Sequence, residues 1–168
     1  MYIFLIILVL LMPIPIYLGF RSLFADRHHQ KVYQHVKDAF QSLIKRQGLS
    51  IAEVNMLGNR LIAMDRNMNK LIFVVYKNGI TRENCLNPNE IISCKIEKKS
   101  SDVSGYIRKV NLELTFRRNG VITFSFFDEE VDDLCDLPSR IKKAQYWKRQ
   151  IQYQISSVPL TNVNRETI

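Results

Sequence analysis

Residues 70 to 79 read KLIFVVYKNG and carry the clearest structural signal in the chain. From Leu71 to Tyr76 every residue is apolar, β-branched or aromatic, which is typical of a buried strand. Asn78 and Gly79 follow almost at once, and an Asn-Gly pair is the strongest short-range signal of a hairpin turn. The segment therefore predicts a strand that turns back within an antiparallel sheet.

Short segments of the same kind lie on both sides of this hairpin, separated by polar turns. In one of them Ile92, Cys94 and Ile96 alternate with polar residues, so we expect these three side chains on one face. A run of strands followed by one helix indicates an α+β fold, with a strongly bent antiparallel sheet or partial barrel closed by a C-terminal helix. The predicted strands cover residues 60–65, 70–76, 80–86, 90–98, 106–116 and 121–127, and the helix covers 137–155.

Several segments between about residue 60 and residue 155 carry a family pattern of their own. They are Leu61-Ile-Ala-Met-Asp65, Lys70-Leu-Ile-Phe-Val74, Ile91-Ile-Ser-Cys-Lys-Ile-Glu97, Ile122-Thr-Phe-Ser-Phe-Phe-Asp128, Ala144-Gln-Tyr-Trp147 and Ile151. On these segments the region resembles a bacterial pleckstrin-homology-like (PH-like) domain. The resemblance implies a fold and a binding or scaffolding role. It does not imply an enzymatic activity, because one fold hosts many functions.

The first twenty residues carry no charged side chain, and Arg21 is the first. At a rise of about 1.5 Å per residue, residues 2–20 span roughly 28 Å as a helix, close to the hydrocarbon thickness of a bilayer. A signal peptide cleaved after Ala25 and a buried helix of a soluble domain are the alternatives. The absence of a basic residue before the apolar run disfavours the first, and the absence of a polar face disfavours the second. We expect an uncleaved transmembrane anchor over residues 1–20.

The charges after this segment predict its orientation. Because basic residues favour the cytoplasmic side, we expect the N-terminus outside the cell and the C-terminal domain in the cytoplasm, at the inner membrane. An odd number of cysteines without close pairing agrees with a reducing compartment. The basic residues that we expect to contact the membrane surface are Arg21, Arg27, Lys31 and Lys37.

Residues 21–50 predict an amphipathic helix beside the membrane. Asp26 is a possible N-cap, and Gly48 is a good residue to follow the C-terminal end. Six basic and two acidic residues give this segment a net charge of +4. Its apolar stripe is a candidate docking surface for a partner helix, which includes a second copy of the chain. The stripe consists of Val32, Val36, Phe40 and Leu43.

No catalytic pattern is present in the sequence, and we expect no enzymatic activity, no cofactor and no metal site. The six acids between Asp128 and Asp136 lack the order of a calcium loop. Anionic lipid is a possible ligand of the first predicted hairpin, through Arg60, Arg66 and Lys70. The basic pI suggests nucleic acid, but acidic residues interspersed among the basic ones argue against it.

The sequence thus predicts an anchor (1–20), a juxtamembrane helix (21–50), a PH-like domain (51–156) and a flexible tail (157–168). The expected function is non-enzymatic, with the cytoplasmic domain mediating protein–protein interaction or assembly at the membrane. Recognition of anionic lipid headgroups is the alternative, and an enzyme is the third possibility.

Overall fold

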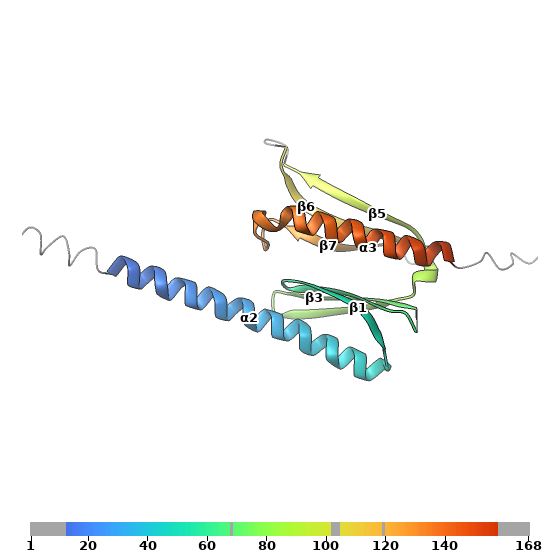
Figure 1. Ribbon diagram of the computed structural model, residues 1–168, viewed down its shortest axis with the longest axis horizontal. Coiled ribbons are helices and arrows are strands. Elements are labelled where there is room, and N and C mark those ends of the chain that lie inside the picture. The colour runs from blue at the N-terminus through green and yellow to red at the C-terminus, as the bar shows by residue number, and fades with distance from the viewer. Residues whose placement is uncertain (1–12, 68, 102–104, 119, 158–168) are drawn as a thin grey trace, which may run out of the picture.

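The structure is a computed structural model that describes residues 13–67, 69–101, 105–118 and 120–157 (Figure 1). Two long helices and seven strands make up most of this part of the chain. The elements are α2 (Pro13–Gln47), β1 (Ile51–Leu57), β2 (Arg60–Asp65), β3 (Lys70–Lys77), β4 (Ile80–Leu86), the 3-10 helix η1 (Pro88–Glu90), β5 (Ile91–Ser100), β6 (Ile107–Phe116), β7 (Gly120–Asp128), the 3-10 helix η2 (Leu134–Asp136) and α3 (Leu137–Ser157).

The strands form two antiparallel sheets in chain order, β1-β2-β3-β4 and β5-β6-β7. The hairpin predicted after residue 76 is confirmed, because Lys77 pairs with Ile80 across the two-residue turn Asn78-Gly79. Both turn residues have positive φ, 53° and 78°, as the tight hairpin turn between twisted strands requires. The α+β class and the C-terminal helix are also confirmed.

Three details differ from the sequence prediction. The described strands form two sheets and no closed barrel, where one strongly bent sheet or partial barrel was expected. Strand β1 was missed, because its apolar residues are interrupted by Glu53 and Asn55 and only Leu57 is fully buried. A bulge between Ile91 and Ser93 shifts the register of β5, so Ile92 is exposed while Ile91 faces the core.

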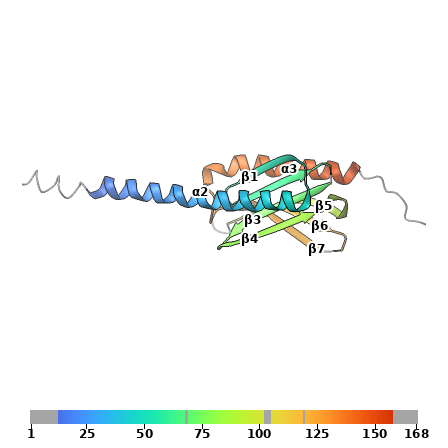
Figure 2. The same ribbon diagram turned by 90° about the horizontal axis from the view of Figure 1, so that it is seen from below.

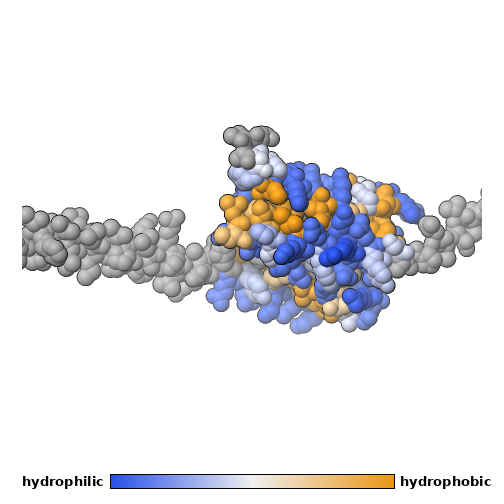
Figure 3. Space-filling model, turned by 45° about the horizontal axis from the view of Figure 1, so that its top comes forward, coloured by the Kyte–Doolittle hydropathy of each residue, from blue (hydrophilic) through white to orange (hydrophobic). Residues whose placement is uncertain are grey.

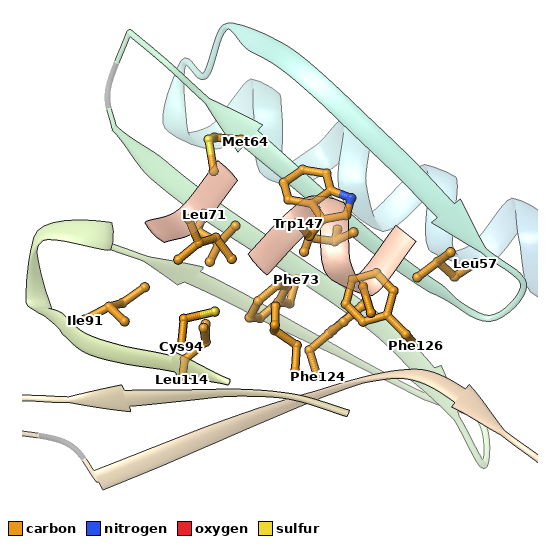
Figure 4. Close-up of a cluster of buried hydrophobic side chains, with 14 of the residues drawn as sticks. Leu57, Met64, Leu71, Phe73, Ile91, Cys94, Leu114, Phe124, Phe126 and Trp147 are labelled. Atoms are coloured by element: carbon orange, nitrogen blue, oxygen red, sulfur yellow. The ribbon is translucent and has the colours of Figure 1, made fainter. Parts of the chain in front are cut away.

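The main core lies between the two sheets and α3. Figure 4 shows Phe73 of β3, Phe124 of β7 and Trp147 of α3 converging in it. The rings of Phe73 and Phe124 stack with their centroids 4.6 Å apart. The indole of Trp147 is fully buried, so it joins α3 to both sheets.

Helix α2 covers the opposite face of the β1–β4 sheet (Figure 2). Val36, Phe40 and Leu43 are buried there, so the stripe expected to dock a partner packs against the chain's own sheet. The prediction that this stripe is free was wrong, because the outer face of β2 and β3 is itself apolar and needs a cover. The boundary expected at residue 50 therefore does not separate the helix from the domain.

The C-terminal end of α2 follows the sequence prediction and its start does not. Gly48 has φ 62°, and the N–H of Leu49 donates to the carbonyl oxygen of Ile44 at 3.1 Å. This six-to-one hydrogen bond is a Schellman motif, and Leu49 and Ile44 also pack in the same apolar cluster. Asp26 is not an N-cap, because the helix passes through it.

Most of the predicted membrane anchor lies outside the described residues, which begin at Pro13, and so does nearly all of the predicted tail. In the part of the chain that is described, no helix is both long enough and apolar enough to cross a membrane.

The domain has two ends, defined by the direction of α2 (Figure 1). The near end lies on the side from which the N-terminal half of α2 projects, and it holds the turns at 58–59 and 78–79 and the loop at 129–133. The far end holds the turn between β2 and β3, the 3-10 helix η1 and the turn between β6 and β7. Strand β2 connects the two ends.

Candidate binding surface

The basic residues expected to bind lipid lie at opposite ends of the domain. Arg66 is exposed and Lys70 half-buried, and the two flank the β2–β3 turn at the far end. Asp65 shapes this turn, since its carboxylate accepts hydrogen bonds from the backbone N–H groups of Asn67 at 3.0 Å and Ser50 at 3.2 Å. Arg60 lies at the start of β2, near the other end. The three residues therefore do not form one site.

Arg60 is also buried and paired with a carboxylate, which corrects the expectation that it contacts lipid. Its side chain is 5% exposed and forms an ion pair with Asp132, which is 3% exposed. Asp132 also accepts a hydrogen bond from the backbone N–H of Asp128 at 2.8 Å and lies 3.6 Å from the guanidinium of Arg140. Arg140 in turn pairs with Asp136 at 3.2 Å. We call Arg60, Asp132 and Arg140 the buried charge cluster. It attaches residues 128–136, which we call the acidic loop, to β2 and α3.

A hollow of about 720 Å³ lies at the near end, between α2 and the acidic loop. Val32 and Tyr33 line it from the helix, and Asp132 and Arg140 of the buried charge cluster line the other side. Its lining mixes acidic, basic, aromatic and apolar side chains, so it presents no single charge to a ligand. Val32, the fourth residue of the expected docking stripe, is half-buried at this hollow.

The juxtamembrane basic residues are only partly described. Lys31 and Lys37 are exposed on α2. Arg21 and Arg27 fall within the helix, but their side chains lie outside the described part.

A second hollow, of about 550 Å³, lies between β5 and α3. We call it the basic groove. Lys98 contributes to it from β5, and Lys148 and Arg149 contribute from α3. None of these three side chains forms an ion pair with a carboxylate among the residues described. The full lining is Ile96, Lys98, Gln145, Lys148, Arg149 and Gln152.

The charge of Lys148 reaches across the basic groove to β5. Burial raises the pKa of the Cys94 thiol to about 11, although the nearby Lys148 ammonium acts to lower it. Lys95, by contrast, points to the outer face of its sheet and pairs with Glu113 at 2.9 Å. The hydrogen bond from Lys95 lowers the pKa of Glu113. Lys95 on the outer face is thus neutralised by a carboxylate, whereas the basic side chains of the groove have no such partner among the described residues.

The basic groove was not among the predicted sites, although the sequence of α3 contains a signal for it. Residues 137–157 include five basic residues and no acidic one. A helix of this composition does not neutralise itself through i,i+4 pairs. Figure 3 shows strongly hydrophilic side chains across the middle of one side of the domain, with apolar side chains next to them.

Within the described residues, no group of three or more His, Cys, Asp or Glu side chains is placed to hold a metal ion. Comparison of the chain with protein-family models, curated proteins and solved structures finds no match. The candidate surface is therefore characterised by its own geometry, as a basic groove beside an edge strand.

Proposed function

We propose that this chain is a single-pass membrane protein whose cytoplasmic domain binds a protein partner, or assembles, at the inner membrane face. The charge-free N-terminal segment supports the anchor, and the basic residues after it support an N-terminus outside the cell. The proposal describes a binding module without enzymatic activity.

The observation that carries the proposal is the continuity of α2. This one helix runs from Pro13 to Gln47, and Val36, Phe40 and Leu43 pack its C-terminal half onto the β1–β4 sheet. The twelve residues from Arg21 to Val32 correspond to about 18 Å of helix. A flexible tether would let the domain turn freely, whereas a packed helix holds it at one height and in one orientation. Such a fixed presentation suits docking onto a neighbouring membrane protein.

The order of elements supports the PH-like part of the proposal. Antiparallel strands followed by a C-terminal helix that packs against them are the order that the resemblance implies, although it implied one bent sheet where the chain has two. The fold alone does not specify a ligand, so the argument for a partner rests on the surface.

Lipid headgroup recognition is the weaker alternative. Arg60 is buried against Asp132, which leaves only Arg66 and Lys70 of the three basic residues. Those two lie at the far end, away from the projecting half of α2 (Figure 1). In the proposed orientation they point away from the bilayer that holds the N-terminal segment.

Crosslinking in intact membranes tests the proposal. A lysine-reactive crosslinker should give a discrete adduct of higher mass with the full-length chain. Val36→Asp, which places a charge in the packing of α2 on the sheet, should abolish the adduct while the chain stays in the membrane fraction. Gln41→Asp, on the exposed face of the same helix, makes the same charge change, so it is the matched control and should keep the adduct. Recovery of monomer alone from wild-type membranes would refute the proposal, and so would activity of a C-terminal reporter that works only outside the cytoplasm.

A further inference from the structure

We infer that the basic groove binds an extended acidic segment of a partner protein, which adds to β5 as a new edge strand. This inference deepens the proposed function and rests on it, because it names the chemistry of the partner and the place where it docks.

The first observation is the open edge of β5. This strand pairs with β6 on one side, and the described residues place no strand on its other side. Register with β6 is regular from Ser93 to Lys99, between two bulges. An unpaired edge of this kind offers backbone N–H and C=O groups that another extended chain can pair with. The regular part is about 20 Å long, so it accommodates roughly seven residues of an added strand.

The second observation is the charge beside that edge. Lys98 lies on β5, and Lys148 and Arg149 approach from α3, all three without a carboxylate partner among the residues described. Alternate side chains of an added strand point toward the same face of the sheet. Acidic side chains at every second position would therefore face α3 and meet these charges. The amides of Gln145 and Gln152 add hydrogen-bonding groups along the same groove.

The acidic loop of a second copy is a poor occupant, because three of its carboxylates are already paired. Asp128 pairs with Lys109, Glu129 with Arg108, and Asp132 with Arg60. A second copy would have to break these pairs to reach the groove. The acidic segment is therefore assigned to a different protein.

Nucleic acid and lipid fit the groove less well. Single-stranded nucleic acids bind on aromatic side chains that stack with bases, and among the described residues no aromatic side chain lines this groove. A bilayer would have to lie across the near end, whereas α3 runs from the near end to the far end (Figure 1). The groove thus faces sideways from the axis of α2, toward proteins that stand beside this one.

The test uses the full-length chain in lipid nanodiscs and a fluorescein-labelled peptide in which Glu alternates with Val over about ten residues. Fluorescence anisotropy measures binding at low and at physiological ionic strength. The double variant Lys98→Glu, Lys148→Glu should weaken binding by about tenfold or more. The matched control Lys77→Glu, Lys142→Glu carries the same charge change on exposed residues outside the groove and should change binding by less than about twofold.

Hydrogen exchange locates the bound peptide. Amides of β5 should exchange more slowly when the peptide is bound, and amides of β7, the other edge of the same sheet, should not change. Failure of the acidic peptide to bind, equal binding of oligothymidine or of phosphatidylserine vesicles, or protection of β7 instead of β5 would overturn the inference.

The membrane crosslink separates this inference from the proposed function. If the adduct persists in the Lys98→Glu, Lys148→Glu variant, a partner binds elsewhere, so the proposed function stands and the groove assignment is wrong. If wild-type membranes give no adduct at all, the proposed function itself is wrong.

Discussion

Removal of the Asp132 carboxylate should destabilise the domain more than any other single charge deletion on its surface or in its loops. Asp132→Ala leaves the guanidinium of Arg60 buried without its partner, and it also removes the acceptor for the backbone N–H of Asp128. Breaking a buried ion pair by deleting one partner costs about 3–5 kcal/mol. Asp136→Ala should cost less than about 1 kcal/mol, because this carboxylate is 52% exposed and water replaces its contact with Arg140.

Urea denaturation followed by tryptophan fluorescence measures both values. Trp147 is the only tryptophan in the chain, and its complete burial makes its emission sensitive to loss of the core. The double variant Arg60→Met, Asp132→Leu should be more stable than Asp132→Ala, since neither side chain then leaves a buried charge unpaired. A loss below about 1 kcal/mol for Asp132→Ala would refute the reasoning, because it would mean that water reaches Arg60 in the folded chain.

Three further results are expected. Phe40→Ala should lower the free energy of unfolding by about 3 kcal/mol, since the ring is buried between α2 and the sheet; an unchanged urea midpoint would show that α2 is not docked. A disulfide exchange reagent at pH 8 should modify exposed Cys135 and leave Cys94 untouched, because burial raises the pKa of Cys94 to about 11; rapid reaction of both thiols would contradict this. Burial acts to raise the pKa of Asp128. The hydrogen bonds that its carboxylate accepts from Lys109 and from the backbone N–H of Glu130 outweigh burial, so the pKa lies below its usual value. The ionised Asp128 therefore stabilises the fold fully above about pH 4, and this contribution is lost as the pH falls further. Lys109→Met should make the free energy of unfolding depend less on pH below about pH 4, and an unchanged pH dependence would count against the Lys109–Asp128 pair.

The parts of the fold that could be predicted from sequence are those in which local chemistry and burial agree. The β3–β4 hairpin followed from an apolar run and an Asn-Gly pair, and the C-terminal end of α2 followed from Gly48. Strand β1 could not be predicted in this way, because a half-exposed edge strand does not need apolar residues at every second position. The bulge after Ile91 could not be predicted from the sequence either, because a one-residue shift of register depends on the partner strand.

The candidate site was harder to predict than the fold for a physical reason. A basic residue in sequence looks the same whether its charge is paired or free. Arg60 was predicted to contact lipid, and only the fold shows that it forms an ion pair with Asp132, more than seventy residues later in the chain. The stripe of Val36, Phe40 and Leu43 looked free for a partner, although amphipathicity predicts only that a helix has a face to bury. The composition of α3, which is basic without a single acidic residue, is the signal from which the groove could have been predicted.

Because α2 is continuous, the direction in which the domain faces depends on the number of residues in the helix. Each residue turns an α-helix by about 100° and lengthens it by about 1.5 Å. One residue inserted between Arg21 and Lys31 would therefore rotate the basic groove about 100° around the helix axis, with little change in its height. Seven inserted residues would raise the domain by about 10 Å and return the groove to within roughly 20° of its original direction. The number of residues in this segment thus sets the direction in which the groove faces around the helix axis, and a neighbouring protein that binds there must lie in that direction.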